Sequence, residues 1–273
     1  MNTKMANQAD HIKQETENYS FGDHVHVVDR NFYIPQLKKH RKVWIYLPKS
    51  YKHSEKKYPV IYMQDGQNLF HASPPRNDEW AVDAVMDGLI REGAKEAIIV
   101  AIDHAGEDRL REYNPYDSEH GKGDGRAYVQ FLVETLKPFI DSEYRTFKDA
   151  NNTSIAGSSM GGLIAMYALI TYPAVFGSAG VFSPAFWLAP KIYDEVTEKS
   201  ALLKNNKVFF VVGDKEGDAM VSNMKRVYYI LNRDGRNANV AMIERPDGKH
   251  TEWFWHREFV SFYQFIAPLF SVG

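Results

Sequence analysis

One serine in this sequence lies in a motif that is typical of a catalytic nucleophile. Residues 155–162 read IAGSSMGG, which puts Ser159 at the centre of a Gly-x-Ser-x-Gly pattern. The pattern follows a short β-like segment and precedes an apolar helical run, the strand–turn–helix setting of a nucleophile elbow. Glycines are needed because a side chain beside so tight a turn would strike the neighbouring strand or helix. We therefore predict Ser159 as a nucleophile; the alternatives are that it only caps a helix, or that Ser158, which lacks glycines in this register, reacts instead.

A serine hydroxyl reacts only when a base removes its proton as it attacks. When the chain order is Ser, Asp/Glu, His, the acid and the base lie just past later strand ends. His250 ends the loop PDGKH, residues 246–250, which follows a C-terminal β-like segment. It is the only one of the ten histidines in such a place, so we predict His250 as the base.

Three carboxylates compete for the role of the acid. The loop GDKEGD, residues 213–218, follows the β-like segment KVFFVV and carries Asp214, Glu216 and Asp218. Asp214 still belongs to the strand end, and Asp218 suits the N-cap of the next helix. Glu216 in mid-turn is preferred; it would accept the Nδ1–H of His250 and stabilise the imidazolium.

Attack on an ester places negative charge on an oxygen, which two backbone N–H groups must stabilise. Met160 directly follows the serine and would supply one of them. The second would come from Gln67, because the preceding Asp65-Gly66 turn brings the chain inward after an apolar β-like segment.

The substrate pocket has four candidate residues. Phe186, Trp187 and Trp253 could flank an aromatic acyl group, although aromatic clusters more often belong to the core. Arg109 could meet an anionic substrate, but pairing with a nearby carboxylate such as Glu112 is preferred.

These candidates need a scaffold that brings distant loops together. After an antiparallel hairpin, β-like and helical segments alternate, which predicts a mostly parallel sheet with helices on both faces. Sites in such sheets lie at the carboxyl ends of the strands. Strands are predicted over residues 23–33, 43–47, 58–63, 97–103, 153–156, 177–182, 207–212 and 239–243, and helices over 79–92, 125–144, 159–172, 218–232 and 252–266. Residues 1–20 are predicted as a flexible segment and residues 21–273 as one domain.

Composition excludes several kinds of chemistry. The 273 residues include no cysteine, so disulfides, thiolate–metal sites and cysteine nucleophiles are excluded. A net charge of −2 argues against a nucleic-acid partner. The longest aliphatic run, AIIVAI at 97–102, falls far short of the ~20 residues that a bilayer requires. Residues 1–20 lack the apolar core of a secretory signal, so we expect a cytoplasmic protein unless a signal has been removed.

Several motifs in chain order together resemble one known family. They are YMQDGQNLF at 62–70, Arg109 with EYNP at 112–115, GSSMGG at 157–162, SPAFW at 183–187 and GDKEG at 213–217. Over about residues 42–265 the chain resembles the esterase branch of the α/β hydrolases. This branch includes siderophore trilactone esterases, the feruloyl and acetyl xylan esterases of carbohydrate esterase family 1, and S-formylglutathione hydrolases. The resemblance implies an α/β-hydrolase fold with Ser159 as nucleophile, His250 as base and Glu216 as acid, and a glutamate there is most similar to the siderophore esterases.

The leading hypothesis is a serine carboxylic-ester hydrolase that acts through an acyl-enzyme on short-chain or aromatic acyl esters. Its partner would be a small-molecule ester, with no cofactor, metal, nucleic acid or membrane. Two other classes stay open: a catalytically silent α/β-hydrolase-fold binding protein, and a metal-dependent hydrolase that uses His24 and His26 with Asp103 or His104.

Overall fold

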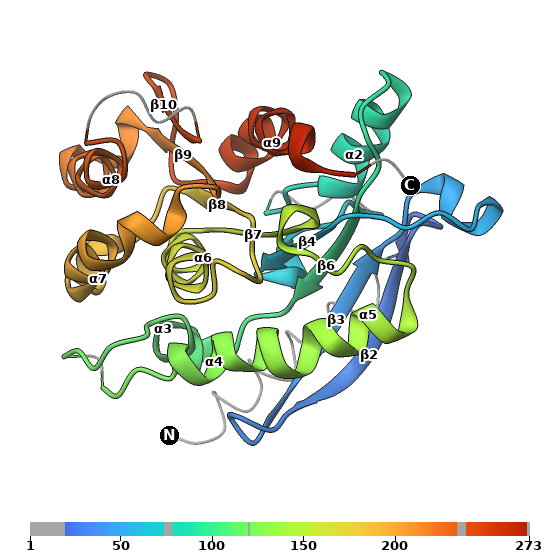
Figure 1. The fold of residues 1–273 in the computed structure, drawn as a ribbon, viewed down its shortest axis with the longest axis horizontal. Helices are drawn as coiled ribbons and strands as arrows, with labels where there is room; N and C mark the ends of the chain where they lie inside the picture. Colours follow the sequence, from blue (N-terminus) through green and yellow to red (C-terminus); the bar gives the residue numbers. More distant parts are fainter. Residues whose placement is uncertain (1–19, 74–77, 120, 234–238, 272–273) are drawn as a thin grey trace.

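An eight-stranded sheet forms the centre of the computed structural model, which describes residues 20–73, 78–119, 121–233 and 239–271 (Figure 1). Its strands follow the order β10-β9-β8-β7-β4-β6-β3-β2. A separate antiparallel pair joins β1 (Ser20–Phe21) to β5 (Ala72–Ser73). The strands of the large sheet are β2 (Val25–Ile34), β3 (Lys39–Tyr46), β4 (Val60–Gln64), β6 (Ile98–Ile102), β7 (Thr153–Ser158), β8 (Ser178–Phe182), β9 (Lys207–Gly213) and β10 (Val240–Arg245).

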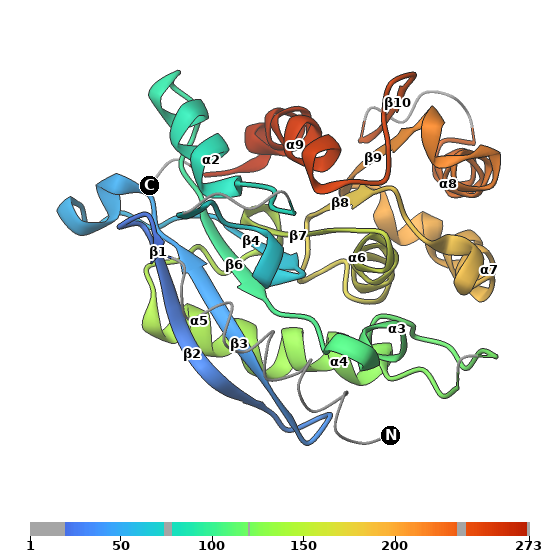
Figure 2. The ribbon, with the colours of Figure 1, turned by 180° about the vertical axis from the view of Figure 1, so that it is seen from behind.

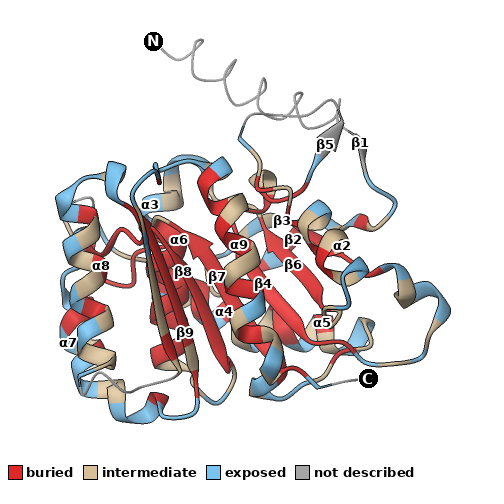
Figure 3. Cartoon of the chain, turned by 90° about the horizontal axis from the view of Figure 1, so that it is seen from above, coloured by how far each residue is buried: buried red, intermediate tan, exposed pale blue. Residues whose placement is uncertain are grey.

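The sheet is parallel from β10 through β6 and antiparallel at β3 and β2. Strands β4, β6, β7 and β8 are buried along their whole length, because helices cover both faces of the sheet. In Figure 3 these central strands lie inside a shell of partly exposed helices. The predicted α/β-hydrolase architecture, with its N-terminal antiparallel hairpin, is confirmed.

Two groups of helices cover the two faces (Figure 1). On one face lie α2 (Val82–Arg91) and α9 (Glu252–Ile266). On the other lie α4 (Gly125–Phe131), α5 (Lys137–Glu143), α6 (Met160–Thr171), α7 (Lys191–Lys199) and α8 (Asp218–Leu231). A single turn, α3 (Arg109–Glu112), follows β6. None of the helices that the structure describes has the length and apolar character needed to cross a membrane.

Helices α4 and α5 are joined by a π-helical turn, Leu132–Leu136, so the helix predicted over residues 125–144 is nearly continuous. This long helical segment runs along the β2–β3 hairpin (Figure 2). There the ring of Phe32 packs against Phe131 and Phe139, with ring centroids 6.0 and 5.2 Å away.

Helix α7 is absent from the sequence prediction. It is only nine residues long and buries only Ile192, Tyr193 and Val196 among mostly polar and charged neighbours, so its apolar stripe is narrow and easily overlooked. The predicted flexible segment 1–20 lies outside the described residues, apart from Ser20 at the start of β1.

Candidate active site

Ser159 occupies a strained turn between β7 and α6. Its φ of 57° lies in the left-handed region that residues other than glycine rarely adopt. A Cβ on Gly157 would lie 2.7 Å from the backbone of Gly161, so only glycine fits there. The N–H of Ser159 donates to the carbonyl of Phe182, and its own carbonyl accepts from the N–H of Ala185. The turn is therefore fixed against the end of β8 and the loop that follows it.

Ser159 and His250 line the same cavity of about 270 Å³. The cavity lies among loops that follow the strands of the sheet, which is where sites of parallel sheets are expected. Its other lining residues are Asp65, Asn68, Trp80, His104, Arg109, Ser158, Glu252 and Trp255.

Glu216 buries its carboxylate beside His250. The side chain is 0% exposed, and its Oε2 lies 2.6 Å from Nδ1 of His250. Its Oε1 accepts hydrogen bonds from the Ser183 hydroxyl at 2.8 Å and the Gly213 N–H at 2.7 Å. A carboxylate can only accept, so Nδ1 carries a proton, and in the neutral ring Nε2 then holds the lone pair.

The two rival carboxylates lie on the same loop but point elsewhere. Asp214 and Asp218 are both exposed. The N-cap prediction for Asp218 is wrong, because Gly217 is the N-cap of α8 and Asp218 is its first residue. Asp214 also lies outside the strand, because β9 ends at Gly213 and Asp214 begins a short helical turn. Of the three carboxylates, Glu216 is the one in contact with His250.

Ser183 and Trp255 hold the Glu216–His250 pair in place. Ser183 follows β8 with a φ of 43°, and its hydroxyl accepts from Nε1 of Trp255 at 2.9 Å while it donates to Glu216. The Trp255 ring meets the His250 ring edge-on, with centroids 4.9 Å apart. Neither supporting residue is among those predicted from the sequence, although Ser183 directly follows a predicted strand and the strand-end rule applies to it equally.

The loops that carry Glu216 and His250 press against each other at two glycines. A Cβ on Gly213 would lie 2.2 Å from the carbonyl carbon of Gly248, and a Cβ on Gly248 would lie 2.5 Å from Cα of Gly213. The N–H of Lys215 donates to the Gly248 carbonyl at 3.1 Å. Direct backbone packing therefore sets the separation of the two loops.

The loop after β4 packs beside the Ser159 turn. Asp65 has a φ of 60°, and a Cβ on Gly66 would lie 2.9 Å from the carbonyl carbon of Ile102, so this turn requires glycine. Gln67 lies on the short helical turn that follows, where its Oε1 accepts from the N–H of His104 at 3.1 Å. Met160 is the first residue of α6. The two residues predicted as backbone donors thus lie on the two segments that meet beside Ser159, and their role stays a prediction.

Arg109 lines the cavity, but its charge is already paired. Its Nε and Nη2 donate to the two carboxylate oxygens of Asp65 at 2.7 and 2.8 Å. Burial alone would lower the pKa of Arg109, but the hydrogen bonds and charge of Asp65 outweigh it and raise that pKa. The preferred pairing of Arg109 with a carboxylate is therefore confirmed, but Glu112 as the partner is wrong, because the fold brings Asp65, 44 residues away, into bidentate contact.

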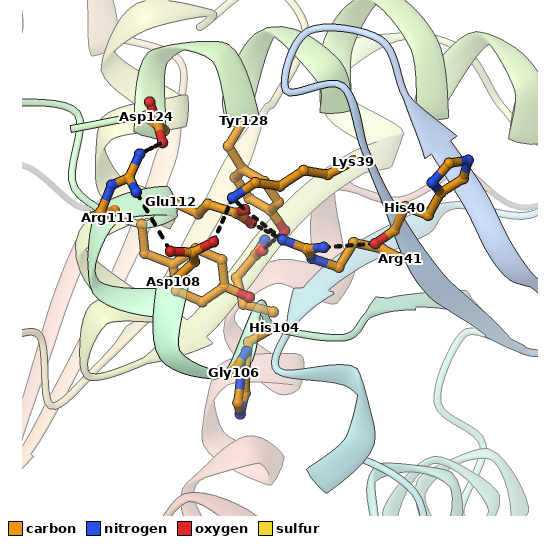
Figure 4. Close-up of polar contacts among 12 residues, drawn as sticks. Lys39, His40, Arg41, His104, Gly106, Asp108, Arg111, Glu112, Asp124 and Tyr128 are labelled. Atoms are coloured by element: carbon orange, nitrogen blue, oxygen red, sulfur yellow. Dashed lines mark hydrogen bonds and ion pairs between the residues drawn. The ribbon is translucent and has the colours of Figure 1, made fainter. Parts of the chain in front are cut away.

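Glu112 instead anchors α3 to the β2–β3 hairpin (Figure 4). It is 1% exposed, accepts from Lys39 Nζ at 2.8 Å and receives two hydrogen bonds from Arg41. Lys39 also contacts Asp108 at 2.7 Å. Because α3 carries Arg109, this cluster fixes the base of the side chain that reaches into the cavity.

The aromatic residues predicted for the pocket lie elsewhere. Phe186 is fully buried in the core. Trp187 is 43% exposed and lines a different hollow, of about 330 Å³, and Trp253 is 63% exposed on the outer side of α9. The cavity takes its aromatic wall from Trp80 and Trp255 instead, because the way α9 docks on the sheet turns residue 255 inward and residue 253 outward.

His104 and Asp103 follow β6 and are both largely buried. Burial lowers the pKa of His104, and its Nδ1 accepts from the Gly106 N–H at 2.9 Å, so the neutral ring carries its proton on Nε2. Burial likewise raises the pKa of Asp103 to about 6, partly offset by a hydrogen bond from Trp44 Nε1 at 2.8 Å. In the described parts of the chain, no three His, Asp or Glu side chains come together as a metal-binding group. His26, named in the metal-dependent alternative, is exposed on β2.

Similarity to known proteins agrees with this fold and site. A family model described as "Putative esterase" matches residues 34–261. The match covers most of the chain, so the chain belongs to this esterase family, and the resemblance seen in its motifs is confirmed. The protein is a carboxylesterase-type hydrolase with an α/β-hydrolase fold.

Individual relatives are distant. The chain is 24% identical to the uncharacterized protein YbbA of Bacillus subtilis, over 81% of this chain and 90% of YbbA. It is 26% identical to an endo-1,4-beta-xylanase/feruloyl esterase of Xylanibacter ruminicola, over 71% of this chain but only 25% of that protein.

Solved structures show the same fold. A ferulic acid esterase superposes with a TM-score of 0.72 at 24% identity, over 90% of this chain and 99% of the other. The enterobactin esterase FES of Shigella flexneri superposes with a TM-score of 0.71 at 19% identity, over 90% of this chain and 58% of that one.

Proposed function

We propose that this protein hydrolyses small carboxylic esters through an acyl-enzyme, with Ser159 as nucleophile, His250 as base and Glu216 as acid. One observation carries the proposal: His250 lines the cavity that Ser159 lines, while its Nδ1 lies 2.6 Å from the buried Glu216 carboxylate. The Nε2 of His250 is thereby left as the acceptor that a serine proton requires.

The reaction runs in two halves. The Ser159 hydroxyl attacks the ester carbonyl carbon while His250 Nε2 takes its proton, and the N–H groups of Met160 and Gln67 stabilise the oxyanion. Collapse of the tetrahedral intermediate breaks the bond to the alcohol, which leaves with the proton from His250. Water, deprotonated by His250, then attacks the acyl-enzyme and releases the acid.

The size of the cavity and the names of the relatives guide the choice of substrates. A volume of about 270 Å³ suits a short acyl group or one compact aromatic acyl group. Relatives named as feruloyl and enterobactin esterases favour testing aromatic acyl esters and trilactones first.

The test is a hydrolysis panel with p-nitrophenyl acetate and butyrate, methyl ferulate, acetylated xylan, S-formylglutathione and a trilactone siderophore. We expect Ser159→Ala to lower kcat on the best ester by a factor on the order of 10⁶ with the fold intact. Ser222→Ala, at an exposed serine on α8, should keep wild-type turnover.

Covalent labelling separates the alternatives. A fluorophosphonate should modify Ser159, as located by peptide mass spectrometry, and EDTA should leave turnover unchanged. Full turnover by Ser159→Ala would refute the serine mechanism. Absence of both labelling and hydrolysis would favour a catalytically silent binding protein.

A further inference from the structure

The cavity beside Ser159 carries an unbalanced charge. The titratable side chains among its described lining residues are Asp65, His104, Arg109, His250 and Glu252. Asp65 and Arg109 neutralise each other through a bidentate pair. His104 is held neutral by burial, and His250 contacts Glu216.

Among the described lining residues, Glu252 is the one whose charge is not paired. It is the first residue of α9, two positions after His250, and its side chain is half-buried in the cavity wall. Across the part of the chain that the structure describes, no Lys, Arg or His nitrogen lies within ion-pair distance of its carboxylate. The N-terminal N–H groups of α9 favour a negative charge at this position.

The field of Glu252 reaches across the cavity. Burial acts to lower the pKa of Arg109, but the net shift is upward. Asp65 causes most of the rise, and the negative charge of Glu252 adds to it. A substrate in a cavity of about 270 Å³ stays within the ~8–10 Å over which charges interact at moderate ionic strength. Among the lining residues that the structure describes, a charged group of the substrate therefore meets a net negative wall, because Arg109, the guanidinium in that set, is already paired with Asp65.

We propose that Glu252 makes this site selective for esters that carry a positively charged ammonium group and makes it reject anionic esters. This inference rests on the proposed function, because it assumes that the ester binds beside Ser159. It argues against the alternative, not preferred from the sequence, that Arg109 receives an anionic substrate.

Three acetate esters of similar size isolate the charge. Acetylcholine is cationic, 3,3-dimethylbutyl acetate is its neutral isostere, and 4-acetoxybutanoate is anionic. We expect wild-type kcat/KM to favour the cation over the neutral ester by about tenfold, equal to about 1.4 kcal/mol, and to disfavour the anion by a similar factor. Glu252→Gln should bring both ratios near one, and Glu252→Asp should restore them. Glu198→Gln, at an exposed position on α7, is the matched control and should keep the wild-type ratios.

The outcomes separate this inference from the proposed mechanism. Unchanged ratios in Glu252→Gln, or an equal loss of kcat/KM on all three esters, would overturn the charge-selection role while the serine mechanism stands. NMR titration of Ser159→Ala with choline, 3,3-dimethylbutanol and 4-hydroxybutanoate reads the same preference from affinity alone. A choline preference that Glu252→Gln does not remove would overturn the inference whether or not the protein turns over esters.

Discussion

Replacing Glu216 with glutamine should separate the charge of the triad acid from its shape. Glutamine has nearly the same volume, so the Ser183 hydroxyl and the Gly213 N–H can still donate to its Oε1. Its NH₂ group then replaces the oxygen that lies 2.6 Å from His250 Nδ1. Two donors would face each other there unless the ring proton moves to Nε2, and a protonated Nε2 cannot accept the proton of Ser159.

The expected loss in kcat is roughly 10⁴-fold, as for the same change in other Ser-His-acid triads. At about 1.36 kcal/mol per tenfold change, this corresponds to about 5.4 kcal/mol of transition-state stabilisation. A hydrogen bond to a charged group accounts for about 1.5–3 kcal/mol of it. The remainder is assigned to the wrong tautomer, so Glu216→Gln should lose far more activity than one missing hydrogen bond explains.

The assay is steady-state hydrolysis of p-nitrophenyl acetate, with thermal unfolding of each variant as a check on the fold. KM should change little, because Glu216 does not line the cavity. Asp214→Asn and Asp218→Asn are the controls from the same loop and should stay within about threefold of wild type, because both side chains are exposed. Activity of Glu216→Gln within tenfold of wild type, or a deeper loss at either aspartate, would refute the assignment.

Two further predictions concern buried charges outside the triad. Burial raises the pKa of Asp103 to about 6, above the value of about 3.9 in an unfolded chain, so its ionised form destabilises the fold. As the pH rises from 4 to 7, urea unfolding should show the wild type losing about 2 kcal/mol relative to Asp103→Asn, which can still accept from Trp44. Glu112→Ala should lower the free energy of unfolding by about 3 kcal/mol, because it leaves Arg41 largely buried without its carboxylate and removes one of the two partners of Lys39.

A different result would contradict each of these two predictions. Parallel stability–pH curves for the wild type and Asp103→Asn would show that Asp103 is not the titrating group. Glu198→Ala on α7 is the control for Glu112, since its side chain is exposed. If Glu112→Ala lowered the free energy of unfolding no more than Glu198→Ala does, the cluster in Figure 4 would add nothing to stability.

Local sequence signals were enough to predict the sheet and the placement of Ser159, Glu216 and His250. Runs of apolar residues on both faces marked the parallel strands, and the candidate residues followed from the rule that parallel strands end at one edge. Glu216 was preferred by assigning Asp214 to the strand end and Asp218 to a helix N-cap, and the structure places neither aspartate there. The mid-turn position of Glu216 was therefore the part of the argument that located it correctly.

The pocket could not be predicted in the same way. Residues 253 and 255 of α9 differ by about 200° around the helix axis, so only the docking of the whole helix decides which tryptophan faces the cavity. Arg109 and Glu112 are one turn apart, which made them look like partners, yet a tertiary contact with Asp65 was stronger than this local pairing.

Loops that meet backbone to backbone at Gly213 and Gly248 have to be redesigned together. At Gly213 and Gly248 the segments 213–217 and 246–250 leave no space for a side chain, so a foreign segment with a side chain at either position would collide with the original segment on the other side. Directed evolution or chimera building with this scaffold should therefore exchange both segments as one cassette. Single substitutions are better introduced in the cavity wall, where side chains, and not the main chain, determine which substrates fit.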